Sequence, residues 1–302
     1  MGGRINAGGK VIAVSSAFIL DKRQLRRSFE RAAPTYDRAA VLQREICARA
    51  LERLDLVKLA PSVILDAGSG TGFAARSMAR RYPRATVIEF EIARAMLQAG
   101  RARLPRWKKW IGGRRAMFVC GDNEQLPIRT GTVGLLWSNL AFQWANDLPR
   151  VFAECQRVLQ PGGLLTFTTL GPDTLKELRQ AFAGDGRHVH VNRFYDMHDI
   201  GDMLVHAGFA DPVMDMEQIT LTYADVETLM RDLKAMGAQN VAAGRSRGLT
   251  GRRALDDLRR RYNGLRRDGR LPATFEVVYG HCWKPEPRLG PSGRPVIEIK
   301  PR

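Results

Sequence analysis

The chain has 302 residues, of which 44% are hydrophobic and 26% charged, a composition that excludes a wholly disordered protein and can supply a large core. The longest apolar run near the start, residues 11–20, is too short for a bilayer of about 30 Å and leads into Lys22 and Arg23 instead of a cleavage site, so we expect a cytoplasmic protein with no membrane attachment. Lysine and arginine exceed aspartate and glutamate by 48 − 31 = 17, which favours acidic partners.

The positive charge is concentrated near the end of the chain. Residues 231–302 hold 17 basic and 7 acidic side chains, so ten of the seventeen excess charges lie there. The four cysteines are far apart and form no CxxC pair, which argues against a disulfide framework or a structural zinc site. The histidines of residues 188–198 also lack the spacing of a zinc-binding motif, and we expect no metal.

The first sixty residues precede the predicted core. Residues 1–24 carry four glycines in the first nine positions and no periodic pattern, which predicts a flexible leader. Residues 25–59 are rich in helix formers, with Val41, Ile46, Ala50 and Leu54 at near-helical spacing, so we expect one or two helices there. Pro34 should divide them.

Strands and helices alternate from residue 63 to residue 168. The expected strands are 63–65, 86–90, 117–120, 133–137 and 164–168, and the expected helices are 74–81, 93–103 and 148–159. Such alternation predicts an α/β fold with a doubly wound, Rossmann-like parallel sheet.

The pattern changes after Gly171. Helices are expected at 173–183, 198–207, 225–236 and 252–265, and strands at 213–222 and 275–283, so a helical insertion or cap follows the fifth strand. We predict one folded domain over residues 25–284, with a ligand-binding half at about 60–170 and further elements at 25–59 and 171–270. Residues 285–302 contain five prolines and are predicted to be a tail.

The strongest chemical signal is a glycine-rich turn after the first strand, with the order Asp-x-Gly-x-Gly-x-Gly from Asp66 to Gly72. Glycines are needed where a side chain would keep the backbone from a ligand. A nicotinamide site would have the order GxGxxG, with pyrophosphate at the helix N-terminus. Asp66 would repel pyrophosphate, whereas it suits a cationic ligand that carries an amino group.

This turn resembles motif I of the class I S-adenosylmethionine-dependent methyltransferases. The resemblance implies that Asp66, Gly68, Ser69, Gly70 and Gly72 surround the methionine part of S-adenosylmethionine. A glycine-rich turn without a ligand is the alternative.

Two further acidic segments fit the rest of such a cofactor. A carboxylate about 20 residues on, at the end of the next strand, is expected to accept both ribose hydroxyls. Glu91 is the first candidate, and Glu89, on the same side of the strand, is its rival. Residues 121–127 resemble the segment that caps adenine, which implies that Asp122 accepts from the adenine amino group and Asn123 offers its backbone amide.

The fourth strand ends in Ser138 and Asn139. Ligands bind at the carboxyl edge of such sheets, so we expect these two polar residues to line the methyl channel.

Longer stretches resemble the malonyl-[acyl-carrier protein] O-methyltransferase family of biotin synthesis, and together they cover about residues 25–284. They are residues 29–33, 36–37, 41–45, 140–148, 171–179, 196–204, 208–217 and 233–238. The chain departs from the family pattern at residues 89–91, where an apolar residue followed by aspartate is commoner. The resemblance implies methyl transfer to the free carboxylate of malonyl on an acidic acyl-carrier protein, which masks its charge for elongation towards pimeloyl.

A carboxylate is already a nucleophile at neutral pH, so this reaction needs positioning and exclusion of water instead of a base. Tyr36 is the candidate lid over the cofactor, followed by Gln43 and Arg44 as positioning residues. Arg179 and Arg193 are candidates to pair with the substrate carboxylate. For Tyr36 core packing is the alternative, and for the arginines a surface charge.

The predicted helix at residues 252–265 carries an apolar stripe of Leu255, Leu258, Tyr262 and Leu265. On its other side, seven residues apart, the basic positions are Arg253, Arg260 and Arg267. They form either a solvated face or a docking face for the acidic carrier.

Other functions stay open at this point. A small-molecule methyltransferase, for example one acting on quinone precursors, would need an apolar pocket and no basic face. The chain might also be expected to act as a cofactor-binding assembly factor without methyl transfer. A nucleic-acid binder would fit the charge, but the sequence has no RNA-binding signature, zinc knuckle or interleaving of aromatic and basic residues.

Overall fold

A computed structural model describes residues 19–104, 116–182, 192, 194–236 and 252–287. Its helices are α1 (Lys22–Ala32), α2 (Tyr36–Ala39), α3 (Val41–Arg53), α4 (Phe73–Arg81), α5 (Arg94–Ala102), α7 (Leu148–Val158), α8 (Lys176–Ala181), α9 (Met197–His206), α10 (Val226–Ala235) and α11 (Arg252–Asn263). Its strands are β1 (Val63–Ala67), β2 (Thr86–Glu91), β3 (Ala116–Cys120), β4 (Val133–Asn139), β5 (Leu159–Leu170), β6 (Ala210–Tyr223) and β7 (Leu271–Trp283). No helix within these ranges is long and apolar enough to cross a membrane.

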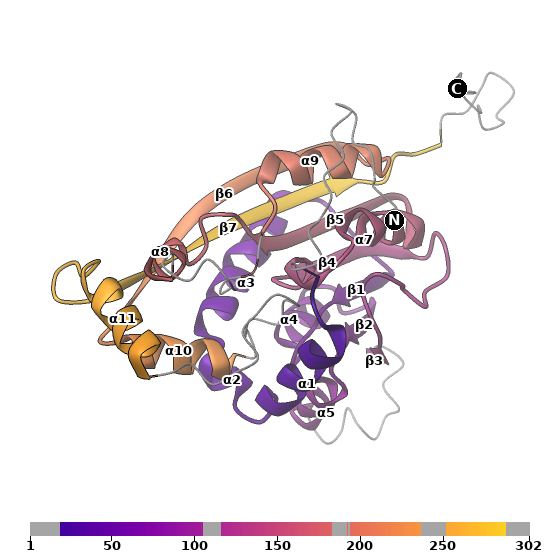
Figure 1. The fold of residues 1–302 in the computed structure, drawn as a ribbon. Helices are drawn as coiled ribbons and strands as arrows, with labels where there is room; N and C mark the ends of the chain where they lie inside the picture. Colours follow the sequence, from indigo (N-terminus) through magenta and orange to yellow (C-terminus); the bar gives the residue numbers. More distant parts are fainter. Residues whose placement is uncertain (1–18, 105–115, 183–191, 193, 237–251, 288–302) are drawn as a thin grey trace, which may run out of the picture.

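The seven described strands form one sheet in the order β3-β2-β1-β4-β5-β7-β6 (Figure 1). The pairs from β3 to β5 are parallel, whereas β7 runs antiparallel to both β5 and β6. This arrangement confirms the predicted doubly wound sheet. The chain reverses its direction of winding between β1 and β4, and a ligand cleft is expected outside the carboxyl ends of these two strands.

The central strands are mostly apolar because both of their faces are buried. In β1, Ile64 packs on one face with residues of α3 and α4, and Leu65 packs on the other with residues of α7 and α9. Successive side chains of a strand point to opposite faces, so five residues of β1 serve both halves of the core.

Helix α3 buries a stripe that differs from the predicted one. Ile46 and Ala50 are buried as expected, but Val41 is 60% exposed and Leu42 is buried in its place. Val41 is the first residue of the helix. Leu42, Ile46 and Ala50 are four residues apart and share one face, which is the spacing that the helix requires.

The described structure begins inside the segment predicted as a leader. Helix α1 starts at Lys22, and the side chain of Asp21 caps it by accepting from the Gln24 N–H. The Leu20 N–H donates to Oδ1 of Asn146 at 2.7 Å, and Nδ2 of Asn146 donates to the Leu20 carbonyl at 3.0 Å. Residues 19–24 are therefore part of the folded domain, and residues 1–18 lie outside the described residues.

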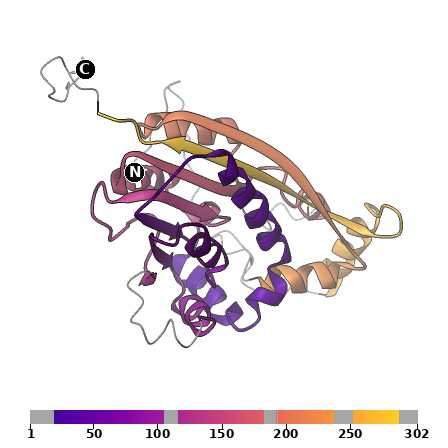
Figure 2. The same ribbon diagram turned by 180° about the vertical axis from the view of Figure 1, so that it is seen from behind.

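Strands β6 and β7 extend beyond the rest of the sheet, and α10 and α11, which connect them in the chain, lie at their far end (Figure 2). The predicted apolar stripe of α11 is confirmed, because Leu258 and Tyr262 are buried and Leu255 and Leu265 pack against the same core. The Tyr262 hydroxyl donates to the Pro272 carbonyl at 2.8 Å and so fixes the helix to the start of β7.

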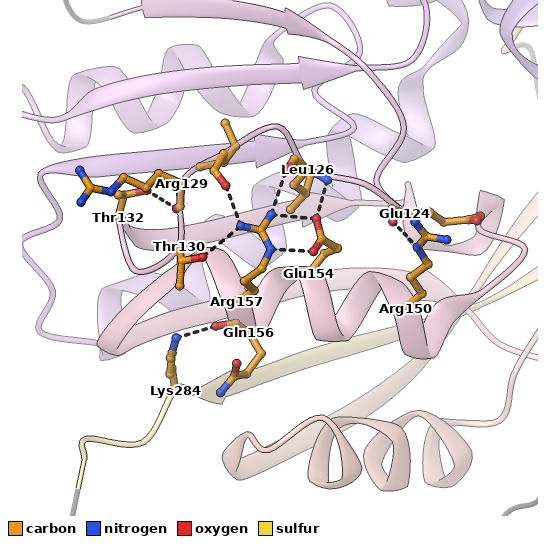
Figure 3. A network of polar contacts seen from close by, with 11 residues as sticks. Glu124, Leu126, Arg129, Thr130, Thr132, Arg150, Glu154, Gln156, Arg157 and Lys284 are labelled. Atoms are coloured by element: carbon orange, nitrogen blue, oxygen red, sulfur yellow. Dashed lines mark hydrogen bonds and ion pairs between the residues drawn. The ribbon is translucent and has the colours of Figure 1, made fainter. Parts of the chain in front are cut away.

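Arg157 of α7 braces the loop between β3 and β4 (Figure 3). Its guanidinium donates to the carbonyls of Leu126 and Ile128, each at 2.8 Å, and forms an ion pair with Glu154. Glu154 in turn accepts from the Leu126 N–H at 2.7 Å. The Arg157–Glu154 ion pair thus provides hydrogen-bond partners for backbone groups of the loop that follows residues 121–123.

We predict that Arg157→Met lowers the free energy of unfolding by about 1–2 kcal/mol, because it leaves two loop carbonyls and one carboxylate without their donor. Chemical denaturation measures the change. Arg129→Met is the matched control, since this arginine lies on the same loop with an exposed side chain, and its effect should stay within about 0.5 kcal/mol. Equal effects of the two variants would contradict the bracing role.

Candidate cofactor-binding site

The glycine-rich turn leaves β1 in a conformation that side chains rarely adopt. Gly68, Gly70 and Gly72 have φ values of 81°, 55° and 74°. The backbone N–H groups of Gly68 and Ser69 both donate to the Phe90 carbonyl, at 2.7 and 3.0 Å, and join the turn to β2. A Cβ on Gly68 would lie 2.1 Å from Cβ of Ala141, so only glycine fits there.

A cleft of about 1010 Å³, open solvent at its mouth included, lies at this edge of the sheet. Glu91, Asp122 and Asn123 line it, and a smaller adjoining cavity is lined by Asp66 and Ser69. The residues that border both are Tyr36, Gln43, Gly68, Gly70 and Asn139. The structure therefore brings most of the predicted cofactor residues to one place.

Glu91, and not Glu89, faces the cleft. Its two carboxylate oxygens accept from the N–H groups of Gly70 and Ala93, at 3.0 and 2.9 Å. Burial raises the pKa of Glu91, and the backbone donors oppose this rise. Glu89 lines neither cavity, because its side chain lies beneath the turn, where a Cβ on Gly72 would be 2.3 Å from its Oε2.

Asp122 lines the cleft and is paired with a residue that the sequence did not indicate. Nζ of Lys22 lies 3.0 Å from Asp122 and 2.9 Å from Glu124. The sequence placed Lys22 in the leader, and no local pattern reveals a contact that spans a hundred residues of chain. Asp21, an aspartate at the N-cap position directly before Lys22, is the sequence signal that could have suggested an ordered helix here.

Ser138 does not lie where we expected. It is fully buried, and its hydroxyl donates to the Ala67 carbonyl at 2.8 Å, so it braces β1 and lines neither cavity. Asn139, the next residue, does face the cleft. Its Nδ2 donates to the Gln43 carbonyl at 3.1 Å, and its Oδ1 accepts from the Thr168 hydroxyl at 2.9 Å.

Tyr36 begins α2 and borders both cavities. A Cβ on Gly70 would lie 3.7 Å from Cε1 of Tyr36, so the ring covers the glycine turn. Burial, with a smaller contribution from Glu91, raises the pKa of the Tyr36 hydroxyl, which stays protonated. Gln43 also borders both cavities, and Arg44 borders the smaller one, near Asp66.

The other candidate arginines lie away from the cleft or outside the described residues. Arg179 is exposed, lines neither cavity and donates to the Thr174 carbonyl at 2.9 Å, so it does not reach a carboxylate in the cleft. Arg260 is 77% exposed and paired with Asp257, and Arg267 is exposed. Arg193 and the side chain of Arg253 lie outside the described residues.

Several buried polar atoms around the cleft have no hydrogen-bond partner in the described part of the chain. They are Oδ2 of Asp66, Oγ of Ser69, Oε1 of Gln43 and Oδ1 of Asn123. Three of these are acceptors only, and buried acceptors favour donor groups of a ligand. S-adenosylmethionine carries such donors in its ammonium, ribose and adenine groups, so the residues present fit this cofactor.

Comparisons with known proteins agree with this geometry. Residues 65–167 match the family described as "Methyltransferase domain". The fold is similar to that of YcgJ from Bacillus subtilis, with a TM-score of 0.56, 12% identity and coverage of 78% of this chain and 98% of that one. It is also similar to phosphoethanolamine N-methyltransferase 2 from Haemonchus contortus, solved with S-adenosylhomocysteine, with a TM-score of 0.53, 17% identity and coverage of 87% and 60%. The fold and the matched domain define a class I methyltransferase.

Relatives at higher identity define the family. The malonyl-[acyl-carrier protein] O-methyltransferase of Gallionella capsiferriformans is 57% identical over 93% of this chain and 97% of its own length. That of Nitrosospira multiformis is 55% identical over 93% and 94%. The chain belongs to the malonyl-[acyl-carrier protein] O-methyltransferase family.

We predict that Gly68→Ala weakens binding of S-adenosylmethionine and lowers the free energy of unfolding, since its Cβ collides with Ala141. Such overpacking costs about 1–3 kcal/mol beyond the strain of the backbone. Gly269→Ala is the matched control, because Gly269 has a φ of 74° with nothing within 4 Å of a Cβ. Calorimetry and denaturation compare the two. Wild-type cofactor affinity in Gly68→Ala would contradict the close approach.

Proposed function

We propose that this chain transfers the methyl group of S-adenosylmethionine to the free carboxylate of malonyl-[acyl-carrier protein], and that the methyl ester enters biotin synthesis. The observation that carries the proposal is the near-full-length likeness to malonyl-[acyl-carrier protein] O-methyltransferases, at 57% identity for the Gallionella capsiferriformans protein. The acidic cleft at the switch point of the sheet supports it.

Three carboxyl groups would hold the donor. Asp66 would face its ammonium group, Glu91 its ribose hydroxyls and Asp122 its adenine amino group, with Asn123 beside the adenine, and these four residues line the two cavities. The donor supplies an electrophilic methyl group on a positively charged sulfur. Glu91 is already oriented by the Gly70 and Ala93 amides, so little rearrangement is needed to receive a ligand.

The chain's contribution to methyl transfer is positioning and exclusion of water. The acceptor side of the cleft is apolar, lined by Leu42, Leu170, Leu233, Met236 and Phe275. A carboxylate that enters the cleft beside these apolar side chains loses its hydration water and becomes a better nucleophile. Tyr36 covers the glycine turn between the two cavities, and Gln43 adds a buried Oε1 that has no partner in the described part of the chain.

Arg44 is the arginine that supports binding of a carboxylate at the cleft. Among the described residues that line the two cavities, the cations are Lys22 and Arg44, and Lys22 is paired with Asp122 and Glu124. Arg44 borders the smaller cavity beside Asp66 and Ser69. This place suits the carboxylate of the methionine moiety as well as that of malonyl, and both would pair with a guanidinium.

The basic end of the chain would dock the acidic carrier. Residues 231–302 hold ten excess positive charges, and Arg260, Arg267 and Arg253 belong to this region. Exposed charges of this kind mainly accelerate encounter with an oppositely charged partner, so they act on the rate of association more than on the chemical step.

The reaction is tested with radiolabelled S-adenosylmethionine and malonyl-loaded acyl-carrier protein. We expect label to appear on the carrier as a base-labile methyl ester, because the acceptor is a carboxylate. Acetyl-loaded carrier is the control, since it differs in lacking the free carboxylate. Equal labelling of the acetyl-loaded carrier would exclude carboxyl methylation.

The docking role is tested with Arg267→Glu. We expect a lower kcat/KM for the malonyl-loaded carrier at low ionic strength, by about tenfold, with the affinity for S-adenosylmethionine unchanged. Arg84→Glu is the control, because this exposed arginine lies two residues before the start of β2, at the amino edge of the sheet, away from the cleft. An equal loss of kcat/KM in both variants would mean that only the net charge of the protein matters, and it would reject a local docking face.

A further inference from the structure

Helix α2, which carries Tyr36, is a single turn that needs tertiary contacts to hold its place. It spans Tyr36–Ala39, its N-cap residue Thr35 makes no side-chain capping bond, and Ala40 after it has a ψ of 46°, outside the helical region. One isolated helical turn is unstable in water, because nucleation costs more than one hydrogen bond returns. The place of Tyr36 at the cleft therefore depends on what binds α2 to the rest of the chain.

Asp37 of α2 binds two other elements at once. Its Oδ1 accepts a hydrogen bond from the Thr71 hydroxyl, and its Oδ2 lies 2.8 Å from Nη2 of Arg103. Thr71 stands between Gly70 and Gly72 in the glycine turn, and Arg103 directly follows α5. One carboxylate thus ties α2 to the glycine turn and to the end of α5.

The two contacts of Asp37 differ in strength. Thr71 is 2% exposed, and its hydroxyl donates to a charged acceptor, which makes a stronger bond than a neutral acceptor does. The side chains of Asp37 and Arg103 are 29% and 37% exposed, and ion pairs in such positions contribute little. The bond from Thr71 is therefore the main contact of the carboxylate.

Both partners of Asp37 are themselves fixed by backbone groups. Nη1 of Arg76 donates to the Thr71 carbonyl at 2.6 Å, and Nη1 of Arg103 donates to the Ala99 carbonyl of α5 at 2.9 Å. Asp37 thus meets two groups that are already oriented, and α2 takes its position from them.

Apolar packing alone would leave the orientation of α2 less defined. Tyr36 packs against the cluster that contains Ala93 and Met96, and α10 packs against α2. Apolar contacts are non-directional, whereas the bond from Thr71 requires one orientation of α2. Because Tyr36 precedes Asp37 directly, this bond also sets its ring against the glycine turn, where a Cβ on Gly70 would lie 3.7 Å from Cε1.

We propose that Asp37 is a positioning residue that latches α2 onto the glycine turn and thereby keeps Tyr36 over the bound methyl donor. The proposal rests on the proposed function, because it assumes that the donor lies in the cleft. Asp37 borders the smaller cavity, but both of its carboxylate oxygens are engaged by Thr71 and Arg103, so it acts through Tyr36.

The test is the rate at which S-adenosylhomocysteine dissociates from the full chain, followed by stopped-flow fluorescence, to which Trp144 of the cleft wall contributes. We expect about tenfold faster dissociation in Asp37→Ala and in Thr71→Val, because each removes the hydrogen bond to the carboxylate. Asp37→Asn keeps an acceptor for the Thr71 hydroxyl and should lie between Asp37→Ala and wild type. Arg103→Gln should stay within about twofold of wild type.

A double-mutant cycle separates a latch that acts through Tyr36 from a general loss of structure. In Tyr36→Ala, the further change Asp37→Ala should speed dissociation by less than about twofold, because the ring that it positions is gone. Independent effects would instead multiply. Denaturation checks that each variant is folded, and Tyr36→Leu takes the place of Tyr36→Ala in the cycle if the smaller side chain does not fold.

Asp55→Ala is the matched control. Asp55 also pairs with an arginine, Arg81, but it belongs to residues 54–56 and lines neither cavity, so its dissociation rate should equal that of wild type.

Three results bear on the latch and on the function. A folded Asp37→Ala with wild-type dissociation would overturn the latch, and so would effects of Asp37→Ala and Tyr36→Ala that multiply. Binding of S-adenosylhomocysteine without any label on the malonyl-loaded carrier would contradict the proposed function and leave the latch standing.

Discussion

The hydrogen bond from the Gly70 N–H to Glu91 joins the glycine turn to the end of β2, and the cleft is built around this junction. The turn can approach β2 so closely because Gly72 carries no side chain where Glu89 of β2 lies against it, and Gly68 likewise leaves room for Ala141. Two more bonds, from Gly68 and Ser69 to the Phe90 carbonyl, hold the same junction from the backbone. The parallel register of β1, β2 and β4 then sets the carboxyl groups of Asp66 and Glu91 at one edge of the sheet.

The wall of the cleft comes from parts of the chain that are distant in sequence. Helix α1 contributes Lys22, Leu25 and Phe29, and Phe29 packs edge-on against Trp144 with ring centroids 5.6 Å apart. Asn146 holds Leu20 through two hydrogen bonds, and Lys22 bridges Asp122 and Glu124. The segment before the Rossmann-like core is thus part of the cleft, and α10 and β7 close its apolar side through Met236, Leu233 and Phe275.

The fold was predictable from the sequence because strands buried on both faces leave continuous apolar runs, as in residues 63–65 and 133–137. The lengths of the strands were harder to predict, because β7 pairs antiparallel with β5 and β6 and all three strands continue past their apolar runs. Within the site, Asp66, Glu91 and Asp122 were placed by the chemistry of strand ends, and their contacts with the donor remain predictions. The predicted position of Ser138 was wrong because successive residues of a strand point to opposite faces, and a shift of one residue decides which polar side chain faces the cleft. Lys22 was missed because its contact with Asp122 depends on tertiary structure.

We propose that Asp66, Glu91 and Asp122 hold one extended, positively charged donor along the cleft. A crystal structure of the protein with S-adenosylmethionine tests it most directly. We expect the ammonium group beside Asp66, the ribose hydroxyls on Glu91 and the adenine amino group on Asp122, with the methyl group directed towards the apolar side. A donor bound elsewhere, or one whose ribose and adenine contact neither Glu91 nor Asp122, would contradict it.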